Sequence, residues 1–66
     1  MTGNEFKELR INRCITQRAV GEALGYRGKA AETTIQNWEY GKQPIPMKHF
    51  RKLASLLQVP VEKFIP

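Results

Sequence analysis

The sequence contains very little cysteine and histidine, and it contains no aspartate. The one cysteine, Cys14, excludes an internal disulfide framework and is typical of a reducing, intracellular setting. One cysteine and one histidine, His49, also argue against a tetrahedral zinc site formed by this chain alone, because such a site needs four ligands. We expect no metal and no cofactor, with Cys14 as a small apolar filler in a turn and His49 on the surface of a helix.

Long apolar runs are also absent. A membrane-spanning helix needs roughly 18–20 consecutive apolar residues, and no stretch approaches that length. The first residues, Met-Thr-Gly-Asn-Glu-Phe, lack the basic region and apolar core of a signal peptide. We therefore expect a cytoplasmic protein with no membrane partner.

The chain has 66 residues, of which 41% are hydrophobic and 26% charged, a globular balance. This length predicts a single domain over residues 1–66, with a thin core because a chain this short buries only about 60% of its unfolded surface. A deep enzyme cleft is not expected. The sequence also lacks a carboxylate pair, a nucleophile–base set and a phosphate-binding glycine loop, so we expect neither an enzyme nor a small-molecule substrate.

Positive charge is in excess, since eleven Lys and Arg against six Glu give a formal net charge of +5. Residues 40–61 contain no acidic residue at all. The basic residues in this stretch are Lys42, Lys48, Arg51 and Lys52. They could be a solvated basic face or the footprint of a polyanion, and charge by itself does not decide between them.

Hydrophobic spacing predicts an all-α fold of five helices and no sheet. Apolar residues recur at helical intervals, while glycine and proline interrupt the pattern. The first two helices should span about Asn4–Arg13, with Asn4 as N-cap, and Thr16–Leu24, with Thr16 as N-cap. Gly21 lies inside the second helix, where it costs about 1 kcal/mol relative to Ala. Such a glycine is best explained by the close approach of another helix.

The third helix should span about Ala30–Tyr40 and stop at Gly41. Its inward stripe comprises Ala31, Ile35 and Trp38, and its opposite side carries Thr33, Gln36, Asn37 and Tyr40. A fourth helix should run from Pro46 to about Gln58, with Phe50, Leu53, Ala54 and Leu57 on one face. Val61, Phe64 and Ile65 should form a short fifth helix that closes the core.

Two charged residues, Arg10 and Glu39, lie beside the predicted apolar stripes of the first and third helices. Burying either charge alone would be costly, whereas a paired and hydrogen-bonded charge is tolerated. We therefore expect Arg10 and Glu39 to meet and to fix one helix against the other through a bidentate contact.

Two ordered segments carry a resemblance to a known family. They are TQRAVGEALG over residues 16–25 and TIQNWEYGK over residues 34–42, followed by Leu53-Ala54 and Leu57-Gln58-Val59. The chain resembles the helix-turn-helix of the phage Cro and repressor type, the XRE family, over roughly residues 5–65. The resemblance implies a compact five-helix, lambda-repressor-like DNA-binding domain, and it implies that Arg10 and Glu39 form the buried pair of this family.

The resemblance also implies how the chain would contact double-stranded DNA. The recognition helix, about Ala30–Tyr40, would lie in the major groove. Base edges would be contacted by Glu32, Thr33 and Asn37, and Gln36 joins them because it lies on the outward face. Phosphates would be contacted by Gln17 at the start of the second helix and by Lys42 and Gln43 after the third.

The interval between Gly25 and Ile35 is about four residues longer than is usual in the family. It contains Tyr26-Arg27-Gly28-Lys29, so either the turn is an extended loop or the third helix starts early. Arg27 and Lys29 are added as phosphate candidates from their charge, beyond what the family implies.

The sequence leaves two functions open. The first is a transcriptional regulator that binds sequence-specifically as a twofold homodimer to a pseudo-palindromic operator, as a repressor of the Cro type does. The second is a protein-interaction module on the same helical frame, such as an antitoxin-like partner-binding domain. The second predicts an exposed apolar patch, for which Tyr26, Tyr40 and Met47 are candidates.

Overall fold

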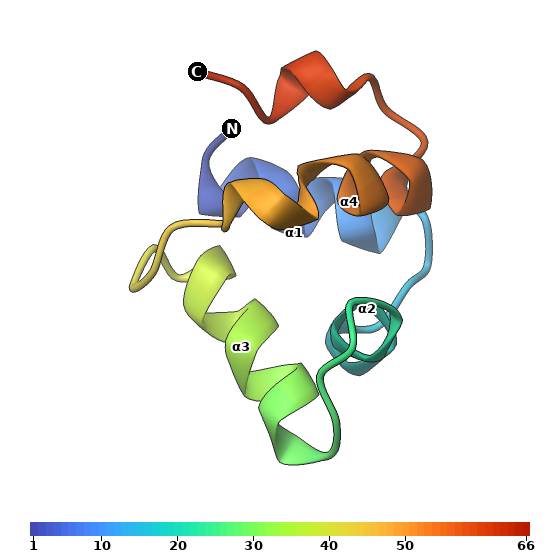
Figure 1. The fold of residues 1–66 in the computed structure, drawn as a ribbon, viewed down its shortest axis with the longest axis vertical. Coiled ribbons are helices and arrows are strands. Elements are labelled where there is room, and N and C mark those ends of the chain that lie inside the picture. The colour runs from blue at the N-terminus through green and yellow to red at the C-terminus, as the bar shows by residue number, and fades with distance from the viewer.

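The computed structural model describes residues 1–66, which form four α-helices and two short 3-10 turns and no strand (Figure 1). In chain order the elements are α1 (Gly3–Asn12), α2 (Gln17–Ala23), α3 (Lys29–Glu39), η1 (Met47–His49), α4 (Phe50–Leu57) and η2 (Val61–Lys63). The all-α prediction is correct, but the prediction of five helices is wrong. The last segment is a single 3-10 turn, in which Phe64 N–H donates to the Val61 carbonyl at 3.0 Å, and Pro66 has no N–H with which to extend it.

The starts of α1 and α2 are both capped by threonine. Thr16 accepts a hydrogen bond from Ala19 N–H at 3.0 Å, as predicted. At α1 the cap is Thr2, whose hydroxyl accepts from Glu5 N–H at 3.0 Å. Asn4 therefore lies inside the helix, and its prediction as N-cap is wrong because a second capping residue stands two positions earlier.

The fourth helix begins later than predicted. Pro46 is extended, and the next three residues form η1, in which His49 N–H donates to the Pro46 carbonyl at 3.0 Å. α4 starts at Phe50 and ends at Leu57, and the residue that caps it, Gln58, has a left-handed backbone with φ of 56°. Pro46 is therefore the cap of a 3-10 turn and not the first residue of α4.

The core lies where α1, α3 and α4 meet, with α2 closing it from below (Figure 1). Its buried apolar residues are Phe6, Val20, Ala31, Ile35, Trp38, Leu53, Ala54, Leu57 and Phe64. The Phe6 and Trp38 rings meet edge to face with centroids 6.1 Å apart, which ties α1 to α3.

Two residues expected to be buried are exposed. Ile65 is exposed because its neighbour Phe64 takes the inward position and stacks on Phe50, with ring centroids 5.5 Å apart. Cys14 is exposed because it lies in the tight turn between α1 and α2, where its φ is 57° and its amide bonds back to the Ile11 carbonyl. The predictions of Ile65 as core and of Cys14 as a filler are both wrong.

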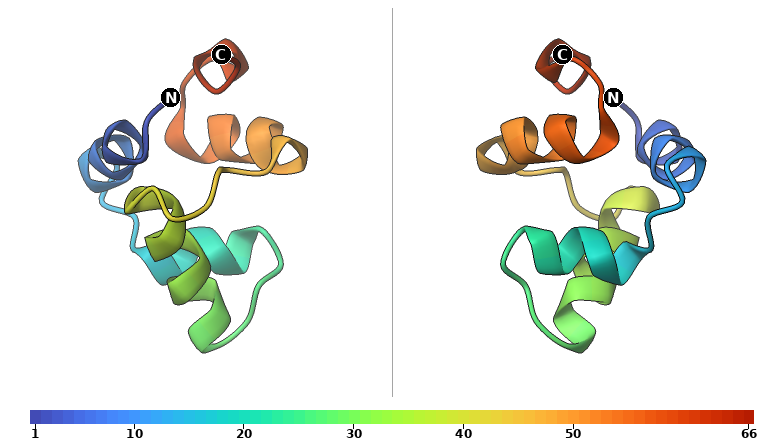
Figure 2. Two further views of the ribbon diagram at one scale, coloured as in Figure 1. Left: turned by 90° about the vertical axis from the view of Figure 1, so that its left-hand side faces the viewer. Right: turned by 90° about the vertical axis from the view of Figure 1, so that its right-hand side faces the viewer.

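α2 and α3 cross at Gly21. A Cβ at this position would lie 2.2 Å from the Ala31 carbonyl oxygen, far inside van der Waals contact. The two helices lie against each other in all three views, with the loop between them at one end of the molecule (Figures 1 and 2). The close approach predicted for Gly21 is confirmed, and it sets the relative placement of the two helices.

Candidate nucleic-acid interface

α3 separates a buried face from a polar outer face. It begins at Lys29 and ends at Glu39, one residue earlier at each end than predicted. Ala31, Ile35 and Trp38 are buried, as the spacing predicted. Of the predicted base-contacting residues, Thr33 is exposed, while Glu32, Gln36 and Asn37 are half-buried.

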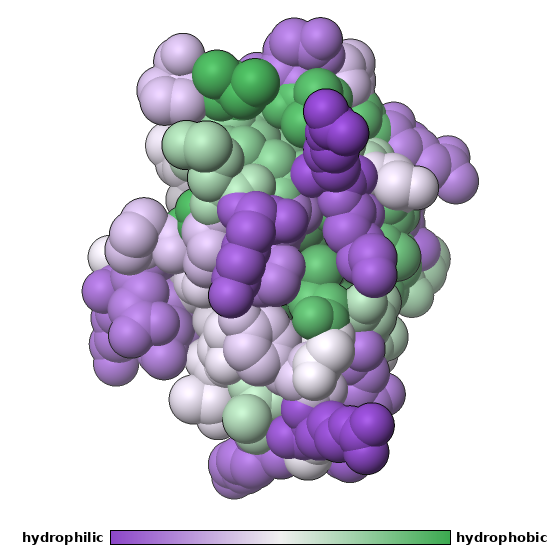
Figure 3. Space-filling view, in the orientation of Figure 1, coloured by the Kyte–Doolittle hydropathy of each residue, from purple (hydrophilic) through white to green (hydrophobic).

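The loop before α3 contains the extra residues. It spans residues 24–28, so the long interval is taken up both by an extended turn and by a helix that starts six residues before Ile35. Gly25 and Gly28 have φ of 103° and 61°, values that glycine adopts readily. Arg27 and Lys29 are exposed, and strongly hydrophilic residues lie among less polar ones at this lower end of the molecule (Figure 3).

The C-terminal end of α3 is fixed by its backbone. Gly41 is left-handed, with φ of 76°, and its N–H donates to the Trp38 carbonyl at 3.2 Å. Lys42 N–H donates to the Asn37 carbonyl at 2.9 Å, which completes a Schellman motif. Gln43 N–H reaches the same carbonyl at 3.3 Å. The exposed Lys42 and Gln43 are therefore held beside the last turn of the outer face.

A buried polar network joins α1, α2 and α3. Arg10 Nε donates to Glu39 Oε2 at 2.6 Å and Arg10 Nη2 to Glu39 Oε1 at 3.3 Å, so the two charges that were predicted to meet do so in a bidentate contact. Arg10 Nη1 also donates to the Ile15 carbonyl at 2.9 Å. Each charged group in this network has a partner.

The amide of Gln17 belongs to this network as well. Gln17 Nε2 donates to Glu39 Oε1 at 3.0 Å, a contact across 22 residues that no local pattern indicated. One of its two amide protons is thus committed to Glu39. The contact of Gln17 with a DNA phosphate stays a prediction. The second amide proton and the backbone at the start of α2 are the groups that would make it.

His49 makes contacts that no sequence pattern indicated. Its ring is half-buried, with centroids 5.9 Å from Trp38 and 5.7 Å from Tyr26, and its Nε2 lies 3.1 Å from the Tyr26 hydroxyl. His49 ends η1 and precedes α4, and the extended connector before η1 brings its ring against Trp38 of α3. Burial lowers the pKa of His49, and the positive charges of Lys48 and Lys52 lower it further.

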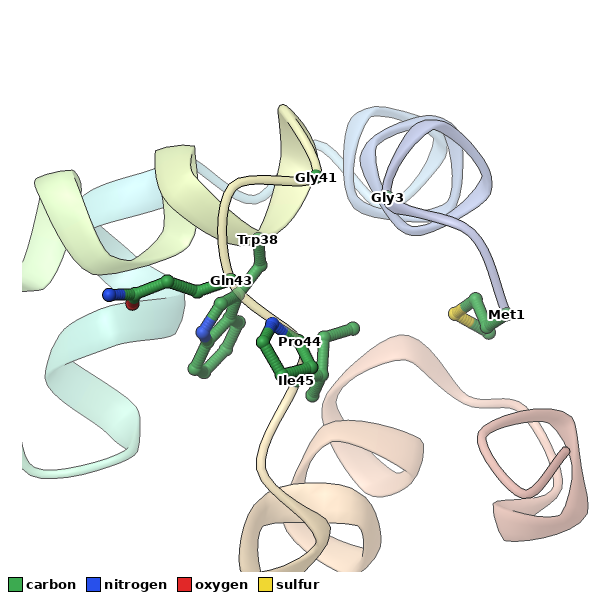
Figure 4. A pocket seen from close by; sticks show the side chains of 7 residues that line it. All are labelled: Met1, Gly3, Trp38, Gly41, Gln43, Pro44 and Ile45. Carbon is green, nitrogen blue, oxygen red and sulfur yellow. The ribbon is translucent and has the colours of Figure 1, made fainter.

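One hollow of the surface lies beside the C-terminal end of α3. A cavity of about 290 Å³ lies between the start of α1 and the connector after α3, lined by Trp38, Gln43, Ile45 and Met1 among others (Figure 4). Its lining includes no acid, base or nucleophile. No group of three or more His, Cys, Asp or Glu residues is placed to hold a metal ion. None of the helices combines the length and the apolar character needed to cross a membrane.

Comparison with known proteins gives one match. A model of the helix-turn-helix family matches residues 6–64, which include α2, α3 and all of the buried core. No curated protein and no solved structure matches the chain.

Proposed function

Because the chain belongs to the XRE type of the helix-turn-helix family, a family of DNA-binding regulatory domains, we propose that it is a sequence-specific transcriptional regulator that binds double-stranded DNA. In this proposal it acts in the cytoplasm as a twofold homodimer of the Cro or repressor kind on a pseudo-palindromic operator, with half-sites about one helical turn apart.

The observation that carries the proposal is the outer face of α3. This face is polar and uncharged over Thr33, Gln36 and Asn37, and exposed cations lie beyond both of its ends, at Arg27 and Lys29 before it and Lys42 after it. Base edges are read by hydrogen bonds, while cations hold phosphates and carry no sequence information. This order of groups along one helix suits a major groove with a phosphate strand at each rim.

The individual roles follow from chemistry and position. Asn37 and Gln36 can pair bidentately with adenine, Glu32 can accept from cytosine, and the methyl group of Thr33 can contact thymine. The backbone of the DNA would be held by Gln17, Arg27, Lys29, Lys42 and Gln43. The buried Arg10–Glu39 pair has a structural role, since it fixes α1 and α2 against the end of the recognition helix.

A salt titration of binding to random duplex DNA tests the proposal. If Arg27, Lys29 and Lys42 each neutralise one phosphate, the logarithm of the binding constant should fall with the logarithm of salt concentration. The expected slope is about −3 for one chain and about −5 for a dimer. Removing Lys42 should make the slope shallower by about 1 per chain. Lys63→Ala, in η2 at the end of the molecule away from the α2–α3 loop (Figure 1), should leave it unchanged. A flat response of the unaltered chain would refute DNA binding.

One observation favours the alternative of a protein-interaction module. Two exposed apolar residues, Met47 and Ile65, lie with the half-buried Phe50 and Val61 around an open hollow of about 320 Å³. Of the candidates predicted from sequence, Met47 and Tyr40 are exposed but Tyr26 is half-buried. This patch lies away from the outer face of α3, so it is compatible with DNA binding, and the flat salt response described above would favour the alternative.

A further inference from the structure

The loop between α2 and α3 has few bonds that hold it in place. Tyr26 N–H donates to the Gly21 carbonyl at 3.0 Å, but residues 27–30 are all exposed. Around Gly25 and Gly28 there is open space, with no atom within 4 Å of where a Cβ would lie. A loop of this kind would be mobile unless a side chain tied it to the body of the protein.

The side chain of Tyr26 provides that tie. Its ring packs against the core, and its hydroxyl lies 3.1 Å from His49 Nε2. His49 joins η1 to α4, and its ring lies against Trp38 of α3. The Tyr26–His49 contact thus connects the extra loop to both α4 and the recognition helix, across 23 residues of sequence.

We propose that Tyr26 and His49 are positioning residues that hold the α2–α3 loop so that Arg27 and Lys29 meet the DNA backbone in a fixed place. This rests on the proposed function. Arg27 follows Tyr26 directly and Lys29 opens α3, so both long side chains start from backbone that the contact immobilises. A loop ordered before binding spares the complex the entropy cost of ordering it on the DNA.

The contact depends on the protonation of His49. In the neutral ring Nε2 accepts from or donates to the Tyr26 hydroxyl, according to the tautomer, whereas in the protonated ring it can only donate. The charges that act on the ring are those of Lys48 and Lys52 from its own segment, with no carboxylate among them. The groups in contact with the ring are the Tyr26 hydroxyl and ring from the loop and the Trp38 ring from α3. A protonated ring would therefore lie beside two cations and could no longer accept from Tyr26.

The pH dependence has a definite sign. Because the pKa of His49 is lowered in the folded chain, the unfolded chain takes up the proton first as pH falls below about 6.5. The contact is therefore complete above that pH and weakens as pH falls through the lowered pKa. The α2–α3 loop should therefore become less ordered as the pH falls.

Tyr26→Phe tests the proposal, since it removes the hydroxyl and keeps the ring. At pH 7.5 we expect affinity for duplex DNA to fall roughly three- to tenfold, the range of one hydrogen bond. In a chain that also carries Arg27→Ala and Lys29→Ala, the same change should have no effect, because the groups it positions are gone. An equal loss of affinity in both backgrounds would overturn the proposal.

Amide exchange tests the same proposal without DNA. The hydrogen-bonded amides at the two ends of the loop are those of Tyr26, which donates to the Gly21 carbonyl, and Ala31, which donates to the Gly28 carbonyl. Their protection factors should fall in Tyr26→Phe, and in the unaltered chain they should fall between pH 7.5 and pH 5. In His49→Gln, which does not titrate in this range, that pH response should be absent. The matched control is Tyr40→Phe, because Tyr40 is 66% exposed and makes no side-chain hydrogen bond. Unchanged protection in Tyr26→Phe would overturn the proposal that Tyr26 positions the loop. If the loop behaves as expected but the unaltered chain binds no duplex DNA, only the proposed function is refuted.

Discussion

Replacing Glu39 by alanine should leave the chain largely unfolded at room temperature. The side chain of Glu39 is 1% exposed and that of Arg10 is 11% exposed. The change therefore leaves a nearly buried guanidinium without its carboxylate partner. Breaking a buried pair on one side costs about 3–5 kcal/mol. A domain of this size has only about 3–5 kcal/mol of stability in total. Gln17 would lose its hydrogen-bond acceptor in the same step.

The chain offers a matched control for this prediction. Arg18 and Glu22 form a second Arg–Glu pair at 3.2 Å, with side chains 60% and 52% exposed. Glu22→Ala should cost no more than about 1 kcal/mol, because exposed pairs contribute little. Urea unfolding followed by the fluorescence of Trp38, the one tryptophan, measures both variants. Equal costs for the two would contradict the structural role given to the buried pair.

Gly21→Ala should destabilise the fold, although helix propensity predicts the opposite. Inside an exposed helix, replacing glycine by alanine gains about 1 kcal/mol. Here the new Cβ would lie 2.2 Å from the Ala31 carbonyl oxygen and 2.6 Å from Ala31 Cα. These are backbone atoms of the recognition helix, so the clash can be relieved only by moving α2 and α3 apart. Overpacking of this kind costs about 1–3 kcal/mol or more, which outweighs the gain in propensity.

The sign of the change decides this test. Ala19→Gly, at an exposed position of the same helix, should lose up to about 1 kcal/mol from propensity alone. If Gly21→Ala raises the midpoint of thermal unfolding, α2 and α3 do not cross at this residue. If it lowers the midpoint, the displaced helix should also bind DNA more weakly.

Helical periodicity predicted much of this fold. The inward positions of Ile35 and Trp38 follow from spacing, and the cap at Thr16 and the stop at Gly41 follow from residue type, because each depends on neighbours within one turn. The meeting of Arg10 and Glu39 could be predicted although it spans 29 residues, since two charges on apolar faces must be satisfied somewhere.

What could not be predicted depends on contacts between distant residues. Gln17 and His49 look like ordinary polar helix residues until Glu39 and Tyr26 are brought beside them by the fold. At the start of α1, Thr2 and Asn4 are both good caps, and local pattern does not rank them. The long interval before Ile35 allowed a loop or an early helix, and the structure contains some of each.

The claim on which the proposed function depends is that the outer face of α3 reads bases. The most direct measurement selects bound sites from a pool of random duplexes and then titrates the enriched duplex and its single-base variants with Asn37→Ala and Lys42→Ala. The end of α3 uses the backbone carbonyl of Asn37, so the alanine variant keeps the helix intact. Asn37→Ala should lose discrimination at one base pair, worth about 1–3 kcal/mol, while Lys42→Ala should weaken all duplexes by a similar factor. If Asn37→Ala instead weakens every duplex alike, as Lys42→Ala does, this face does not read sequence.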